Sequence, residues 1–342
     1  MKAAMFYGKE DLRVEEVPVP SPGPGQVKLR NGFAGICGSD LHLYFFPDSV
    51  PMELGMPRIL GHEFSGTVVA RGEGVTGVEV GHNVAVYPLV HSCGECTACR
   101  NGRRFSCPEQ ASVGATAPGG GLAEYTTVEA SCAHILPGNV DLKMGALVEP
   151  MAVAWHGVAR SGIQTGGSAL IAGAGPIGIG AYFALKARGV GKIVVSEPNA
   201  ERRKLIERLG AHVVDPTTED LAATVAALTD GGSVDAAIDA AGSGSALVSA
   251  ASCLAAGGRA VVLAFYEHAI EFQPTQLMLA ETEIVGAVGY THEEFDEVIA
   301  AMASGAYDFS GWVEETTLDA TVESIKALRT GTGAKVLIRA GA

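Results

Sequence analysis

The sequence predicts an α/β protein with two domains, an N-terminal all-β domain of barrel type and a second domain built on a doubly wound parallel sheet. Two patterns along the 342 residues support this prediction. About the first 150 residues read as short strands separated by prolines and glycines, which is typical of small barrels. From about Ser168, buried strands alternate with helical stretches, which implies a parallel sheet with right-handed crossovers.

Each predicted element follows from a local pattern. Short apolar and β-branched runs between turn-forming residues predict N-terminal strands at Ala3–Phe6, Gln26–Phe33, Glu63–Ala70 and Asn83–Val86. In the second part we expect a strand at Ser168–Ala172, a helix to about Arg188, a strand at Lys192–Ser196, a helix at Ala200–Leu209, and strands at Val213–Val214, Val234–Asp239 and Arg259–Ala264. The tail carries an amphipathic helix at Phe295–Ser304 and a closing strand at Lys335–Arg339. The expected divisions are residues 1–150, 151–288 and 289–342.

Composition excludes several classes of protein. The formal net charge of −14 disfavours nucleic-acid binding. No stretch of about 20 apolar residues lacks turn formers, and the first residues show no basic region followed by an apolar core. Seven cysteines, an odd number, suit a reducing compartment. We therefore expect a cytoplasmic protein without a membrane span, with Cys132 and Cys253 as buried thiols.

Four cysteines fall within fifteen residues, at Cys93, Cys96, Cys99 and Cys107. Such thiolates can converge on one ion in the closed, tetrahedral arrangement of structural zinc. An iron–sulfur cluster is the main alternative, although the gap before the last cysteine is longer than that pattern requires. A disulfide pair is a third, but nothing indicates secretion. We predict a structural zinc site.

A glycine-rich turn predicts a dinucleotide site. Gly173, Gly175, Pro176, Ile177 and Gly178 follow a strand and open a helix, where phosphates can meet the N–H groups of the helix N-terminus.

An acidic residue at the end of the next strand supports the same site. Glu197 can accept the ribose hydroxyls of adenosine and would repel a 2′-phosphate, which favours NAD over NADP. Arg202 and Arg203 lie close by in sequence, where an arginine could tolerate that phosphate. Arg202 is also a predicted cofactor-binding residue. The bland alternative is an ordinary strand–helix turn followed by a solvated acid.

A second metal site is predicted from residues that are separated in sequence. Gly35–His42 is expected to form a loop after a strand and supplies Cys37, while Gly61-His62-Glu63 opens a further segment. A thiolate and an imidazole suit zinc. Glu149 is the third candidate ligand because an unpaired carboxylate in an apolar stretch is costly. Three protein ligands leave the fourth position open, as in catalytic zinc, and Glu63 is an alternative ligand.

Together these motifs resemble the medium-chain, zinc-dependent alcohol dehydrogenase superfamily. The matching elements, in order, are Gly-Ile-Cys-Gly-Ser-Asp-Leu-His at 35–42, Gly-His-Glu at 61–63, the four cysteines, Glu149-Pro150 and the glycine turn at 173–178. The use of Glu149 resembles the polyol and butanediol branch. His82-Asn83 departs from the common Asp-Arg, and the segment 39–61 is compact.

The resemblance implies a GroES-like barrel domain that carries two zinc ions, a Rossmann domain for NAD, and a C-terminal segment that returns to the barrel. It also implies homo-oligomers, dimers or tetramers. Catalytic zinc would lower the pKa of a substrate hydroxyl, whose carbon gives hydride to the nicotinamide. Ser39 and His42 are expected to pass the proton to solvent, and Asp40 to orient His62.

The substrate prediction rests on the aromatic run Tyr44-Phe45-Phe46, which follows the proposed proton path. A large polyol would need several polar partners there, and an amino acid would need a cation for its carboxylate. The run offers neither. We therefore expect a small secondary alcohol or vicinal diol, with 2,3-butanediol oxidised to acetoin, and diacetyl reduction in reverse. Sorbitol-like polyols and L-threonine are the alternatives.

Overall fold

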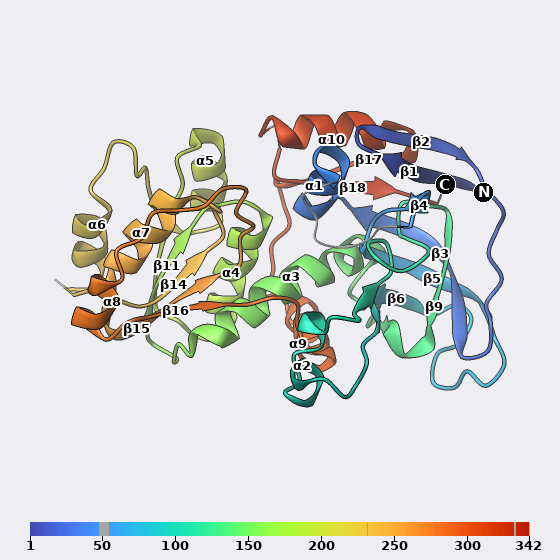
Figure 1. Cartoon of the computed structure of the whole chain (residues 1–342), viewed down its shortest axis with the longest axis horizontal. Helices are drawn as coiled ribbons and strands as arrows, with labels where there is room; N and C mark the ends of the chain where they lie inside the picture. The colour runs from blue at the N-terminus through green and yellow to red at the C-terminus, as the bar shows by residue number, and fades with distance from the viewer. Residues whose placement is uncertain (48–54, 231, 332, 342) are drawn as a thin grey trace. The chain divides into compact units, whose positions relative to one another are not determined.

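The computed structural model describes residues 1–47, 55–230, 232–331 and 333–341. The chain divides into two compact units (Figure 1). The first comprises Met1–Glu149, Thr291–Ser304 and Phe309–Ala342, and the second comprises Pro150–Tyr290 and Gly305–Asp308. In the described part of the chain, every helix is too short or too polar to cross a membrane.

The first unit is mainly antiparallel β-structure. Its strands are β1 (Lys2–Gly8), β2 (Asp11–Glu16), β3 (Gln26–Gly35), β4 (Arg58–Ile59), β5 (Glu63–Arg71), β6 (Asn83–Val86), β7 (Leu89–His91), β8 (Ala111–Ser112), β9 (Tyr125–Glu129), β10 (Ala133–Ile135), β17 (Val313–Thr317) and β18 (Lys335–Arg339). Its largest sheet has the order β10-β6-β5-β3-β18-β17, with β9 also pairing with β3. The closing strand β18 pairs antiparallel with the end of β3, where Leu337 faces Gly35. The C-terminal strand therefore reaches the residues that precede Cys37.

The helical elements of this unit are short. They are α1 (Gly38–Phe45), α2 (Thr97–Arg100), α9 (His292–Ala303) and α10 (Thr321–Arg329), with 3-10 turns η2 (Arg104–Ser106), η3 (Ala130–Cys132) and η4 (Leu318–Ala320). The helix α3 (Leu142–Ser161) begins in this unit and continues into the second, because the division falls between Glu149 and Pro150.

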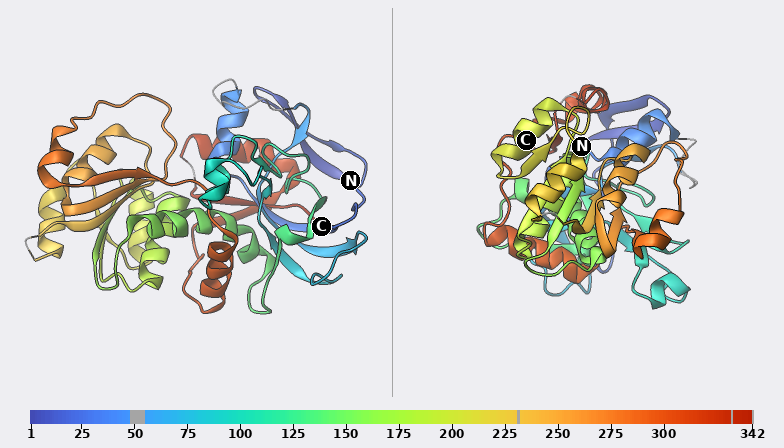
Figure 2. Two further views of the ribbon diagram at one scale, coloured as in Figure 1. Left: turned by 60° about the horizontal axis from the view of Figure 1, so that its bottom comes forward. Right: turned by 90° about the vertical axis from the view of Figure 1, so that its left-hand side faces the viewer.

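The second unit is a parallel sheet flanked by helices (Figures 1 and 2). Its strands are β11 (Ser168–Ala172), β12 (Lys192–Ser196), β13 (His212–Val214), β14 (Val234–Asp239), β15 (Leu254–Val262) and β16 (Glu283–Gly286), and its helices are α4 (Pro176–Ala187), α5 (Ala200–Arg208), α6 (Leu221–Leu228), α7 (Gly244–Ser252) and α8 (Thr275–Ala280). The sheet order β13-β12-β11-β14-β15-β16 reverses between β11 and β14. Ligands of doubly wound sheets bind at such a switch point, beyond the carboxyl ends of the strands.

Two predicted elements need correction. Residues 38–45 form the helix α1 rather than a loop, because the Asp40 carboxylate accepts the Cys37 backbone N–H at 2.9 Å and the helix buries Leu43 and Tyr44. The strand predicted at Arg259–Ala264 instead begins at Leu254 and ends at Val262. Its early part pairs with β14 through an irregular register, and the glycines at this irregularity hid the extension from a sequence pattern.

Candidate metal and cofactor sites

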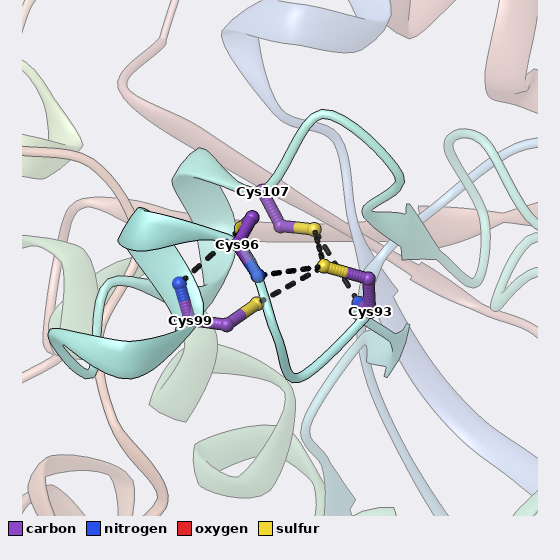
Figure 3. Close-up of side chains that lie close together, drawn as sticks. All are labelled: Cys93, Cys96, Cys99 and Cys107. Carbon is purple, nitrogen blue, oxygen red and sulfur yellow. Dashed lines mark hydrogen bonds between the residues drawn. The ribbon is translucent and has the colours of Figure 1, made fainter.

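The four clustered cysteines converge, as Figure 3 shows. The Cys93 sulfur lies 3.5 Å from that of Cys107 and 3.9 Å from that of Cys99. Zinc–sulfur bonds of about 2.3 Å in a tetrahedron place sulfurs about 3.8 Å apart, so the spacing fits a single zinc ion. All four are free thiols, so no disulfide forms here. A multi-iron cluster would hold the sulfurs farther apart, because each would bind a different iron.

Local backbone geometry prepares these cysteines for a cation. The N–H of Cys96 points to the Cys93 sulfur at 3.3 Å, and the N–H of Cys99 points to the Cys96 sulfur at 3.4 Å. Backbone N–H groups of Cys96 and Glu95 lower the pKa of Cys93 to about 7. A thiolate is the form that ligates metal.

A second cluster joins three residues from two segments. Single donor atoms of Cys37, His62 and Glu63 lie within 4.8 Å of one another. Cys37 stands immediately before α1, and Glu63 is the first residue of β5. The set contains a thiolate, an imidazole and a carboxylate, which are the donor types zinc binds in proteins.

Glu149 lies outside this set of three but close to it. Its side chain is buried in α3 at 7 % exposure, and its charge acts on both His62 and Lys335. Both candidate carboxylates, Glu149 and Glu63, therefore lie near Cys37 and His62. Glu63, the predicted alternative ligand, is the one within the group of three.

A buried lysine that the sequence did not single out completes the cluster. Lys335, on β18, is 2 % exposed and forms an ion pair with the Glu63 carboxylate. Its ammonium also donates to the Ile36 carbonyl at 2.9 Å. A Cβ on Gly35 would lie 2.0 Å from the Glu63 carboxylate, so a larger residue there would displace the ends of the Glu63 and Lys335 side chains. In the sequence, Lys335 stands out only as a lysine at the start of an apolar strand. A local pattern cannot identify its partner, Glu63, because the two residues are 272 positions apart.

The charges in the cluster favour a cation. Burial lowers the pKa of His62. The opposing effects of Cys37 and then of the Asp40 and Glu149 carboxylates together outweigh burial and raise this pKa well above its ordinary value. Burial lowers the pKa of Lys335, and Glu63, Cys37 and Glu149 outweigh that effect and raise it. The acidic groups Cys37, Asp40, Glu63 and Glu149 outnumber the cationic groups His62 and Lys335. A divalent ion fits this excess of buried negative charge.

His62 is oriented for ligation. Its Nδ1 lies 3.9 Å from a carboxylate oxygen of Asp40, which is fully buried. Among the described residues these two atoms have no hydrogen-bond partner. In a neutral imidazole, Nδ1 can carry the proton toward Asp40, so that Nε2 presents its lone pair to a metal.

Ser39 lies on the first turn of α1 beside this cluster, and His42 follows on the last turn of the same helix. The Ser39 hydroxyl is 3.4 Å from His62 Nε2. His42 Nδ1 lies 2.9 Å from the Gly38 carbonyl. Because a carbonyl only accepts, Nδ1 carries the proton, and the lone pair of neutral His42 is on Nε2, where it can take a proton.

The glycine turn of the second unit has the predicted shape. Gly173 has φ +97°, which favours glycine. A Cβ on Gly178 would lie 1.9 Å from the Gly173 carbonyl, whereas one on Gly175 would meet no atom within 4 Å. The third glycine therefore lets the helix pack on the strand, and the second faces open space where a phosphate fits.

A cavity of about 410 Å³ lies at the carboxyl ends of β11, β12 and β14. Its lining includes Gly173, Gly175, Glu197 and Arg202. Glu197 is 4 % exposed, and its carboxylate accepts the N–H groups of Ala174 at 2.7 Å and Asn199 at 2.8 Å. Each carboxylate oxygen has two acceptor positions, so both retain capacity for a ribose hydroxyl.

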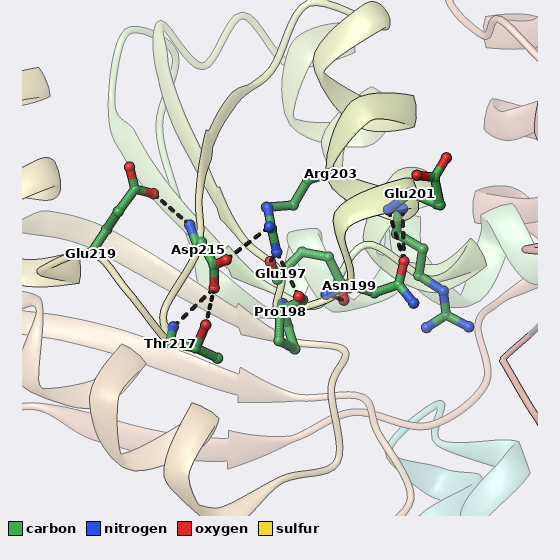
Figure 4. Close-up of polar contacts among 9 residues, drawn as sticks. Glu197, Pro198, Asn199, Glu201, Arg203, Asp215, Thr217 and Glu219 are labelled. Atoms are coloured by element: carbon green, nitrogen blue, oxygen red, sulfur yellow. Dashed lines mark hydrogen bonds and ion pairs between the residues drawn. The ribbon is translucent and has the colours of Figure 1, made fainter.

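The two arginines near Glu197 differ in their contacts, and Figure 4 shows those of Arg203. Arg203 donates to the carbonyls of Glu197 and Pro198, at 2.9 and 2.5 Å, and pairs with Asp215 at 2.8 Å. It is thus held within the protein. Arg202 lines the cavity, so it is the arginine placed to contact a cofactor.

The aromatic run at the end of α1 does not form one apolar wall. Tyr44 is 2 % exposed and belongs to the core of the first unit, whereas Phe46 is 40 % exposed. The Arg329 guanidinium, from α10, lies 5.9 Å from the Phe45 ring centre and 5.1 Å from that of Phe46. A cation therefore stands beside a run that offers none in sequence. Residues 48–54 of the compact segment 39–61 lie outside the described residues.

Comparison with known proteins places the chain in a family. The model of the alcohol dehydrogenase GroES-like domain matches residues 23–138, and that of the zinc-binding dehydrogenase matches residues 176–304. A 2-dehydro-3-deoxy-L-galactonate 5-dehydrogenase from Pseudoalteromonas atlantica is 37 % identical over 345 residues, covering 100 % of this chain and 99 % of that protein. Sorbitol and L-threonine dehydrogenases are 30–32 % identical.

Solved structures agree. The 2R,3R-butanediol dehydrogenase of Bacillus subtilis has a TM-score of 0.90 at 33 % identity, over 99 % of each chain. An alcohol dehydrogenase of Escherichia coli complexed with NADH has a TM-score of 0.89 at 28 % identity, over 99 % of each chain. These matches confirm the predicted resemblance and fold class. The chain belongs to the medium-chain, zinc-dependent alcohol dehydrogenase superfamily.

Proposed function

We propose that the protein transfers hydride between a small secondary alcohol or vicinal diol and NAD, with 2,3-butanediol and acetoin as the best-supported pair and diacetyl reduction in reverse. The cluster of Cys37, His62 and Glu63 carries this proposal, because it combines a zinc-binding donor set with Ser39 at its edge. The likeness to a butanediol dehydrogenase over 99 % of both chains supports the substrate class.

The proposal includes two zinc ions. The four-cysteine lobe holds one, and Cys37 with His62 and one carboxylate, Glu149 or its alternative Glu63, holds the other. When bound, the second ion would act as a Lewis acid on the substrate hydroxyl. Asp40 holds the His62 ring in register. Ser39 accepts the proton of the hydroxyl, and His42 Nε2 passes it toward solvent.

A sugar-acid substrate is the second candidate. The galactonate-type relative is 37 % identical over the whole chain, and a carboxylate substrate needs a cation. Arg329 supplies one beside Phe45 and Phe46.

Initial rates of NADH formation separate the candidates. The separate stereoisomers of 2,3-butanediol are compared with sorbitol, L-threonine and L-galactonate. We expect the highest kcat/KM for one butanediol isomer. A higher kcat/KM for L-galactonate would favour the sugar-acid substrate over the diol. Turnover of sorbitol or L-threonine alone would contradict both substrate proposals but not the proposed hydride transfer.

Glu197 is proposed to select NAD. Its carboxylate would accept ribose hydroxyls and repel a 2′-phosphate. Because hydrogen bonds to charged groups are worth about 1.5–3 kcal/mol, we expect Glu197→Gln to lower kcat/KM for NAD roughly 10- to 100-fold and to raise the relative use of NADP. The NAD/NADP ratio is the readout, since it does not depend on the folded fraction. Glu201→Gln, an exposed acid on α5, is the control and should leave the ratio unchanged. An unchanged ratio in Glu197→Gln would refute this role.

We also propose that two copies associate through β16, the edge strand of the parallel sheet. Edge strands offer unpaired backbone groups, and exposed Met278, Leu279 and Val288 flank this one. The molar mass in solution tests this assembly: a dimer or tetramer agrees, and a monomer does not.

A further inference from the structure

His134 holds the helix α9 at two points. Its Nδ1 lies 2.6 Å from the Asp296 carboxylate, and its Nε2 lies 2.9 Å from His292 Nδ1. His292 and Asp296 are one turn apart on α9, so a single imidazole from β10 spans the first turn of the helix. The His134 side chain is only 10 % exposed. None of these residues belongs to the metal or cofactor sites.

This helix has a particular place in the chain. The segment Thr291–Ser304 belongs to the first unit, while the residues before it and the short stretch Gly305–Asp308 after it belong to the second. The first turn of α9 is therefore where the chain re-enters the first unit. A capping box between Thr291 and Glu294 defines that start.

Aromatic packing fixes the two imidazoles. The His292 ring stacks on Tyr87 with centres 3.8 Å apart and an interplanar angle of 20°. Tyr87 also meets Phe105 edge-on at 5.8 Å, and Phe105 lies in η2, between Cys99 and Cys107. Tyr87 thus lies between the first turn of α9 and the cysteine lobe, in contact with a residue of each.

The histidine contact depends on the number of protons. A hydrogen bond between two imidazole nitrogens needs one N–H and one lone pair. The contact forms as long as one of the two rings keeps a lone pair for the N–H of the other. If both rings are protonated, two N–H groups face each other at 2.9 Å, and the contact cannot persist.

We propose that His134 and His292 form a proton-sensitive clamp that holds the first turn of α9 while one imidazole is neutral and releases it when both are protonated. Release is confined to this turn. The rest of the helix stays docked because Phe295, Val298 and Met302 are buried and because Asn139 donates to the Ala303 carbonyl at 2.7 Å.

The surrounding charges set the pH range. Glu293 and Asp296, from α9, and Arg104, from η2, act on His292. Glu294, from α9, and Cys132, from η3, act on Tyr87, which stacks on His292.

Burial, and then the charge of His134, lower the pKa of His292; Glu293 opposes them, Arg104 adds to them, and the net effect is a lowered pKa. A histidine with a lowered pKa in the folded state binds its proton more readily when released. The clamp is therefore closed above the ordinary histidine pKa of about 6.5 and weakens as pH falls below it.

Amide exchange of the peptide 291–303, corrected for intrinsic rates, tests the clamp between pH about 8 and about 5.5. We expect protection to fall roughly tenfold across this range, which corresponds to about 1.4 kcal/mol. His292→Asn keeps an acceptor at the Nδ1 position without a titrating group and should remove the pH dependence. Asn139→Ala, which loosens the other end of α9, should lower protection at both pH values and keep the dependence.

Three results would overturn the proposal. The first is protection of 291–303 that does not change with pH in the unmodified protein. The second is a His292→Asn variant with the same pH dependence. The third is a parallel loss of protection in peptides from β3 and β5, since the change would then be global.

Discussion

Replacing Cys37 by alanine is expected to remove one of two zinc ions and to reduce hydride transfer about 10³-fold or more. Lewis-acid polarisation by a metal is worth several kcal/mol, and each step of about 1.4 kcal/mol is tenfold in rate. Cys37 is the only thiolate among the proposed ligands, and without it zinc keeps one imidazole and carboxylates alone, a weaker donor set. Elemental analysis of zinc per chain and kcat with the best alcohol substrate are the two measurements.

A buried thiol outside both clusters supplies the matched control. Cys132 is 4 % exposed and its sulfur lies 3.7 Å from the Leu89 carbonyl. Cys132→Ala should retain two zinc ions and most of the activity. If Cys37→Ala retained both ions, or lost one without losing activity, the assignment of a catalytic metal to this cluster would be wrong.

Replacing Lys335 by methionine is expected to destabilise the protein by about 3–5 kcal/mol, because it leaves a buried carboxylate without its partner. Glu63 and Lys335 are each about 2 % exposed, so water cannot take over the role of the ammonium. Urea-induced unfolding, followed by circular dichroism at neutral pH, measures the change.

A double variant and a surface control sharpen this test. Lys335→Met combined with Glu63→Gln removes the unpaired charge and should recover part of the lost stability. Lys326→Met, at an exposed lysine of α10, should stay within about 0.5 kcal/mol of the unmodified protein. A double variant as unstable as Lys335→Met alone would show that the effect arises from packing rather than from the stranded charge.

Most elements of the fold could be predicted from local sequence patterns. The strands Asn83–Val86, Lys192–Ser196 and Lys335–Arg339 were predicted with the bounds that the structure has, because apolar runs between turn formers encode strands directly. The glycine turn and the four cysteines could also be recognised in the sequence, because the residues of each motif lie within a short stretch of the chain. The helix α1 was missed because a glycine and a serine open it, and these residues also suit a turn.

The sequence by itself determined the fold class, the shape of the glycine turn and the grouping of the four cysteines, and it supplied the thiol, imidazole and carboxylates of the second cluster. Only the tertiary structure decided that Glu63 pairs with Lys335, that Arg203 is held by Asp215, and that His134 meets His292. The physical reason is that periodicity and turn-forming residues determine which face of a helix or strand a side chain occupies. The partner across a long loop is set when distant strands and helices come together, and no local pattern records it.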